Sequence, residues 1–181
     1  MSLARFLRRF ARAKKGTAAV EFAIIAPLIM VPLLLSSVEL IDALGVDARA
    51  QNAAASLADV VARDTSVSDE EVEGYWDALE VLMYPNSTDN VDVRITSIRI
   101  IDSSTAEVVW SEVKGGGMTP MQAGSRVTNL DERMMIPGTS IIMADSAYTY
   151  DSPVKFLFEN GATFRHTAYR RARMVDPIVR E

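Results

Sequence analysis

Residues 14–40 read KKGTAAVEFAIIAPLIMVPLLLSSVEL, in which two lysines, one glycine and one glutamate precede a long apolar run. No charged residue lies between Phe22 and Val38. An uncharged run of this length predicts a helix that spans a membrane. Glu21 directly precedes the run. A charge in hydrocarbon costs roughly 2.5–3.5 kcal/mol on insertion scales, so an ionisable residue there is a functional hypothesis by default.

Charge is unevenly distributed along the 181 residues. Residues 1–15 hold six of the 19 basic residues and no acid, which leaves 13 basic residues against 24 acidic ones in the rest of the chain. A basic arm before an apolar run is typical of a cytoplasmic anchor that obeys the positive-inside rule. The other interpretation, a nucleic-acid-binding tail, fits poorly with an acidic body. We therefore expect no nucleic-acid partner. The arm itself is either an amphipathic helix on an anionic leaflet or a solvated tail.

The apolar run is expected to remain as an anchor. The residues at its C-terminal end, 35–39, match the small-residue cleavage site of a secretory signal poorly. Pro27 and Pro32 lie within the run, and each removes a backbone donor and clashes with the preceding turn. The sequence therefore predicts helix kinks at Pro27 and Pro32.

The helical pattern continues beyond the apolar run and becomes amphipathic. We expect one helix from about Thr17 to Arg63, divided into a transmembrane and assembly part (17–41) and an amphipathic extension (42–63). Small and apolar residues at three/four spacing predict the buried stripe of the extension. This stripe consists of Leu40, Leu44, Ala48, Gln51, Ala55, Leu57, Ala58, Val61 and Ala62.

Residues 64–181 predict an α+β domain outside the membrane. Ser68 and Glu71 form a capping box that begins a second helix, and Pro85 ends it. Period-two alternation then predicts an antiparallel sheet of four to five strands, with a bulge near Thr96-Ser97. The expected strands are residues 91–100, 106–113, 140–150, 154–158 and 163–174. The fold class is therefore α+β, with a long N-terminal transmembrane helix that extends into a periplasmic domain.

Side chains for common enzyme chemistry are scarce. The chain has no cysteine, and its single histidine, His166, falls in a predicted strand, where a surface residue is a better interpretation than a metal ligand. Tyrosines and arginines near the C-terminus form either a core with a solvated edge or an aromatic–cationic partner surface. They are Tyr148, Tyr150, Tyr169, Arg170, Arg171 and Arg173. We expect no catalytic residue, no metal and no cofactor, and hence no enzyme.

The segment Gly16-Thr17-Ala18-Ala19-Val20-Glu21-Phe22, between a basic arm and an apolar helix, resembles the processing site of type IV prepilins. With Pro27 soon after it, and with residues 141–150 and 169–173, the chain resembles the TadE-like branch, pilin-like proteins of the tight-adherence (Flp) pilus. The resemblance implies that a prepilin peptidase cuts between Gly16 and Thr17 and removes a basic leader, residues 1–16. It assigns assembly and recognition to Glu21 and Phe22.

The implied function is pilus assembly or priming in the tight-adherence or type II-like secretion machinery. The expected partners are prepilin peptidase, other pilin-like subunits, Tad inner-membrane assembly proteins and membrane lipid. The expected location is the bacterial inner membrane, crossed once, with a cytoplasmic N-terminus and a periplasmic domain. Glu21 would pair with the new Thr17 amine of a neighbouring subunit, which lowers the cost of both charges in lipid. The alternative is an unprocessed single-span protein whose periplasmic domain binds or senses a ligand.

Overall fold

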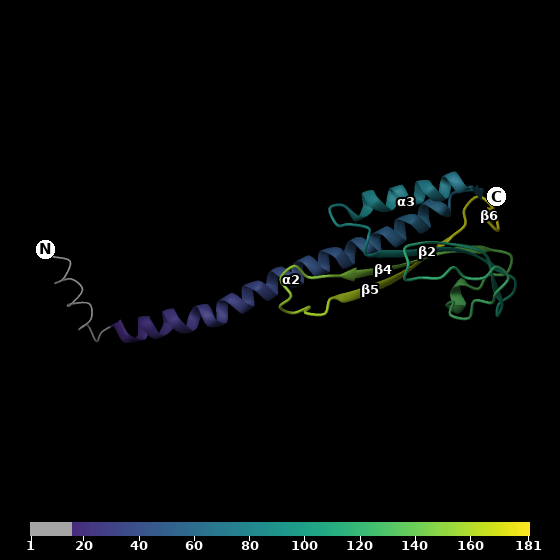
Figure 1. Ribbon diagram of the computed structural model, residues 1–181. Helices are drawn as coiled ribbons and strands as arrows, with labels where there is room; N and C mark the ends of the chain where they lie inside the picture. The colour runs from purple at the N-terminus through teal and green to yellow at the C-terminus, as the bar shows by residue number, and fades with distance from the viewer. Residues whose placement is uncertain (1–15) are drawn as a thin grey trace.

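The computed structural model describes residues 16–181, so the predictions for the basic arm, residues 1–15, lie outside the described residues. One helix dominates the molecule: α2 (Thr17–Val61) is 45 residues long. Its first half projects alone, and its second half lies against the sheet (Figure 1). The helix is long and apolar enough to cross a membrane, and no residue of its most apolar 18-residue window is buried by the described part of the chain. The predicted continuous helix is confirmed.

The buried face of α2 differs from the predicted stripe. Leu40, Leu44, Ala48 and Gln51 are exposed, Leu44 by 58%, and that part of the prediction is wrong. The residues that pack against the domain are Ala43, Val46, Ala50, Ala53, Ala54, Leu57, Ala58 and Val61. Alanines occur on every side of this segment, so their spacing cannot fix which side is buried. Two polar contacts also join this part of α2 to the sheet. The Tyr150 hydroxyl donates to Asp42 at 2.9 Å, and the His166 ring lies 2.7 Å from Asp47.

The second helix, α3 (Asp69–Met83), begins with the predicted capping box. The Ser68 N–H donates to the Glu71 carboxylate at 2.6 Å, and the Glu71 N–H donates to the Ser68 hydroxyl at 3.3 Å. These reciprocal bonds satisfy donors that a helix start leaves without partners. The helix buries Val72, Tyr75, Leu79 and Met83.

A four-stranded antiparallel sheet carries the rest of the domain, which confirms the α+β class. Its order is β3-β2-β4-β5. The strands are β2 (Val91–Ile100), β3 (Ala106–Lys114), β4 (Ser140–Tyr150) and β5 (Ala162–Arg171). The register of β2 against β3 shifts between Ser97 and Ile98, which confirms the predicted bulge. One face of the sheet packs on α2, and α3 packs against α2 (Figure 1).

The other face of the sheet has its own small core. Ile98, Ile100, Ala106, Ile141 and Met143 are buried there. Apolar residues of the loop between β3 and β4, which contains the 3-10 helix η2 (Glu132–Met134), cover them. This second core explains why β4 is buried on both faces.

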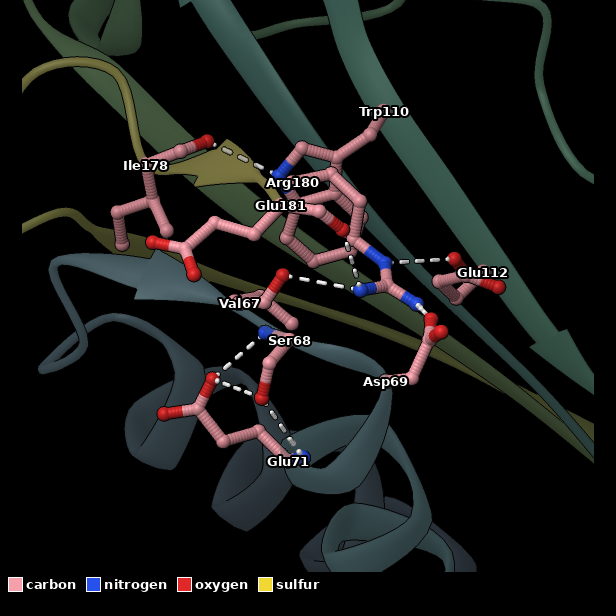
Figure 2. A network of polar contacts seen from close by, with 9 residues as sticks. All are labelled: Val67, Ser68, Asp69, Glu71, Trp110, Glu112, Ile178, Arg180 and Glu181. Carbon is pink, nitrogen blue, oxygen red and sulfur yellow. Dashed lines mark hydrogen bonds and ion pairs between the residues drawn. The ribbon is translucent and has the colours of Figure 1, made fainter.

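Two short strands were not predicted. β1 (Ser66–Val67) pairs in parallel with β6 (Val179–Arg180), close to the C-terminus. Arg180 holds them to the domain (Figure 2): its Nε donates to Glu112 at 2.9 Å and its Nη1 to the Val67 carbonyl at 3.0 Å, and it also pairs with Asp69. The bond to Glu112, more than that to Asp69, raises the pKa of the Arg180 guanidinium. The Trp110 indole N–H donates to the Ile178 carbonyl at 2.9 Å.

Residues 154–158 do not form the predicted strand. They belong to the β4–β5 loop, residues 151–161, and their backbone N–H groups bond to side chains instead of to a neighbouring strand. The Val154 and Lys155 N–H groups lie 3.2 and 3.1 Å from the Ser152 hydroxyl, and Lys155 has a left-handed φ of 55°. The short apolar run has the composition of a strand, but hydrogen bonds from its backbone to side chains fix a loop conformation instead.

Candidate functional site

The start of α2 is the first part of the candidate site. Thr17 to Glu21 are all exposed, as is Phe22. Within residues 16–181 the Glu21 carboxylate forms no hydrogen bond or ion pair. Thr17, Glu21 and Phe22, which the sequence predicts for processing and assembly, therefore lie together on the exposed start of the helix.

Packing among residues 16–181 does not explain the glycine at position 16. Its φ is −109°, which any residue can adopt, and an added Cβ would meet no atom within 4 Å. A glycine is usually needed where φ is positive or where another group approaches closely. Neither condition holds at Gly16 in the described structure.

The apolar run exposes large side chains on all sides of the helix. They include Val20, Phe22, Ile24, Ile25, Leu28, Ile29, Met30, Val31, Leu33, Leu34, Leu35 and Val38. The Ser36 and Ser37 hydroxyls donate to the carbonyls of Pro32 and Leu33, both at 2.7 Å. Their polar atoms thus have partners within the helix, as hydrocarbon requires. α2 stays helical through Pro27 and Pro32, and the kinks expected at these residues stay a prediction.

Glu39 is a buried acid that the sequence did not reveal as a site. It is only 1% exposed, although it follows directly on the apolar run. Its carboxylate accepts hydrogen bonds from the backbone N–H groups of Leu157 at 2.6 Å and Phe158 at 3.2 Å. From the sequence alone, Glu39 is only the first charged residue after the uncharged run. Its function as an acceptor could not be predicted, because its hydrogen-bond partners lie more than a hundred residues further along the chain.

Glu21 and Glu39 therefore bracket the uncharged run but differ in surroundings. The run from Phe22 to Val38 is about 25 Å long at 1.5 Å per residue, close to the ~30 Å of a bilayer core. Glu21, at one end, has no partner among the described residues, whereas Glu39, at the other, is enclosed by the β4–β5 loop. Glu39, at the end of the run that the domain covers, therefore needs no partner from another molecule for its charge.

A polar cluster on the sheet was also missed. Arg94, Asp145 and Thr167 are direct cross-strand neighbours on β2, β4 and β5. Arg94 donates to Asp145 at 2.6 and 3.0 Å, and Thr167 donates to the same carboxylate at 2.6 Å. They line a hollow of ≈ 310 Å³. Because Arg94 is already paired, this cluster has little free charge with which to bind a ligand.

The tyrosines near the C-terminus belong to the core. Tyr148 and Tyr150 are buried, so the aromatic–cationic partner surface is wrong and the core interpretation holds. Burial raises the pKa of the Tyr150 hydroxyl, which also donates to Asp42. Arg173 pairs with Asp59 of α2. Across residues 16–181, no three His, Asp or Glu side chains gather as a metal site would require.

Comparison with known families gave a match to the first helix of the chain. The model of a family described as TadE-like protein matches residues 16–59. Comparison with curated proteins and with solved structures gave no match. The matched segment begins at Gly16, contains the apolar run and ends near the end of α2, before α3 and the sheet. The first helix of the chain is therefore similar to the TadE-like family, and among the described residues it is the helix long and apolar enough to anchor the protein in a membrane.

Proposed function

We propose that this chain is a pilin-like subunit that prepilin peptidase cuts between Gly16 and Thr17, and that its helix then packs with other pilin-like helices during pilus assembly or priming. The observation that carries the proposal is the exposed start of α2. Among residues 16–181, no packing contact requires a glycine at position 16, and the Glu21 carboxylate forms no hydrogen bond or ion pair. The family match begins at the same glycine.

Accessibility supports cleavage at this bond. The first turn of a helix has backbone N–H groups without intrahelical partners, and Gly16 supplies no side-chain cap for them. The residues on the C-terminal side of the bond, Thr17 to Val20, are small or β-branched and exposed. A peptidase can therefore engage this segment without unfolding the sheet domain. A glycine before the bond suits an enzyme site that excludes a side chain there.

The charge of Glu21 supports an assembly role after cleavage. Removal of residues 1–16 creates a cationic amine at Thr17, one helical turn from Glu21. A carboxylate left alone in hydrocarbon is costly, and an amine from a neighbouring helix offsets part of that cost. The exposed apolar side chains around Glu21 provide the surface on which such a helix would pack.

The charge distribution supports an orientation in the inner membrane. The basic arm favours the cytoplasm, which leaves the acidic domain in the periplasm. The alternative, an unprocessed ligand-sensing protein, would use a hollow such as the one beside Arg94. That arginine is paired with Asp145, so it offers little free charge to an anionic ligand.

Intact mass of the membrane protein, with and without prepilin peptidase, tests the proposal. We expect residues 17–181 when the peptidase is present and the full chain when it is absent. Gly16→Val should block the change, whereas Gly74→Ala, which adds a Cβ in equally open space on α3, should not. An N-terminus at Met1 or Ser2 in cells with active peptidase contradicts the proposal.

A further inference from the structure

We propose that the β4–β5 loop is a membrane-surface anchor. In this arrangement the side chains of Val154, Phe156 and Leu157 enter the boundary between headgroups and acyl chains in the leaflet from which α2 emerges. The inference rests on the membrane-anchoring helix and does not depend on cleavage at Gly16. It assigns a lipid-binding surface to the sheet domain, beyond the helix that the TadE-like family model matches.

The position of the loop carries the first step. The Glu39 carboxylate binds the Leu157 and Phe158 N–H groups, so the loop is fastened to α2 at the residue that directly follows the uncharged run. The loop lies at the end of the sheet nearest the projecting half of α2 (Figure 1). With the run in the bilayer core, Glu39 and the loop lie at the membrane surface.

The side chains of the loop divide into two groups. Phe158 turns inward, and its ring meets Tyr150 edge to face with centroids 5.7 Å apart. Val154, Phe156 and Leu157 point outward and are 36%, 49% and 51% exposed. These three apolar side chains do not serve the core. Exposed Leu40 and Ile41 on the adjoining turn of α2 continue the apolar surface into the membrane segment.

The charges near the loop are compatible with lipid. Glu39 is enclosed and bonded to backbone N–H groups, so it does not present a bare charge to the membrane. The exposed acids of the loop, Asp151 and Glu159, lie on either side of the apolar segment 154–158 and not within it. Lys155 lies between the apolar residues and pairs with Asp151 at 3.4 Å. A lysine can lay its apolar stem along the interface while its ammonium stays in water. Apolar residues flanked by such a lysine are typical of interfacial segments.

A spin-label depth measurement tests the anchor on the full chain. The protein has no cysteine, so Phe156→Cys gives one unique site for a nitroxide. We would place one full-length chain in each phosphatidylcholine nanodisc and compare accessibility to oxygen and to a water-soluble nickel chelate. Leu157→Cys provides a second position should the first substitution disturb the loop.

Two matched sites calibrate the measurement. Ile136→Cys lies before the start of β4, at the opposite end of the sheet, and Ile136 is 46% exposed, close to the value for Phe156. Ile24→Cys, 69% exposed within the uncharged run, provides the lipid reference. We expect the oxygen-to-nickel accessibility ratio at position 156 to be several-fold above that at position 136 and to approach that at position 24.

Either of two results overturns the inference. A ratio at positions 156 and 157 equal to that at position 136 would place the loop in water. Low accessibility to both reagents would place it inside protein. Because the full chain is used without peptidase, failure here leaves the processing proposal standing, and failure of processing leaves the depth result standing.

Discussion

At the scale of single residues, Glu39 links the two parts of the molecule. Glu39→Ala removes the acceptor of the Leu157 and Phe158 N–H groups. A buried donor left without a partner costs about 1–3 kcal/mol, so we expect a lower free energy of unfolding and faster amide exchange at both residues. Glu39→Gln keeps one acceptor oxygen and should have a smaller effect. Glu132→Ala, at an exposed acid, is the control. Unchanged amide exchange at Leu157 would contradict the bond.

Glu71 gives a pH-dependent prediction at the same scale. Hydrogen bonds from the Ser68 backbone and hydroxyl hold the pKa of the Glu71 carboxyl below its ordinary value of 4.5. A carboxyl with a lowered folded-state pKa stabilises the protein above its unfolded pKa, and this contribution is lost as the pH falls through the folded value. The stability difference between wild type and Glu71→Gln should therefore be larger at pH 7 than below pH 4. Urea unfolding at both pH values measures it. Glu70→Gln, beside the capping box, should show no comparable change.

At the scale of secondary structure, the long periodic elements were predictable and the short ones were not. α2, α3 and the four main strands follow from apolar periodicity, an uncharged run and a capping box. β1 and β6 have two residues each, too few to show a period, and they lie more than a hundred residues apart in the chain. The buried side of α2 could not be predicted either, because alanines occur on every side of the helix. Glu39 gave no local signal, since its partners come from the β4–β5 loop.

A substitution at Arg180 tests whether the contacts of this side chain hold β6 against the domain. Arg180→Ala removes its bonds to Glu112 and the Val67 carbonyl and its pairing with Asp69. Hydrogen bonds to charged groups contribute about 1.5–3 kcal/mol, so we expect a loss of about 2 kcal/mol in the free energy of unfolding. Arg133→Ala, whose ion-pair partner is the adjacent Asp131, is the matched control and should change stability little. Equal urea midpoints for the two variants would show that β6 does not depend on Arg180.

At the scale of the whole molecule, the protein combines an anchor helix with a separate α+β domain. The family match covers residues 16–59, which is the helix without the sheet. The sequence predicted both parts, but only the structure showed how the domain closes over one end of the apolar run through Glu39. Glu21 at the other end stays uncovered by the described chain. Under the proposed function we therefore expect a partner subunit to bind at the Glu21 end of the helix.

Glu21→Ala tests this expectation in cells that carry the Tad machinery. The substitution leaves Gly16 and Thr17 in place, so we expect the mass of residues 17–181 as in wild type. Assembly should fall sharply, because the Thr17 amine of a neighbouring subunit would then lie in lipid without a counter-charge. Ser37→Ala is the control, since its hydroxyl bonds only within its own helix. Pilus counts by electron microscopy, together with membrane levels of the protein, separate lost assembly from lost protein. Normal piliation in Glu21→Ala cells would remove the charge pair from the mechanism and leave apolar packing alone to hold the helices together.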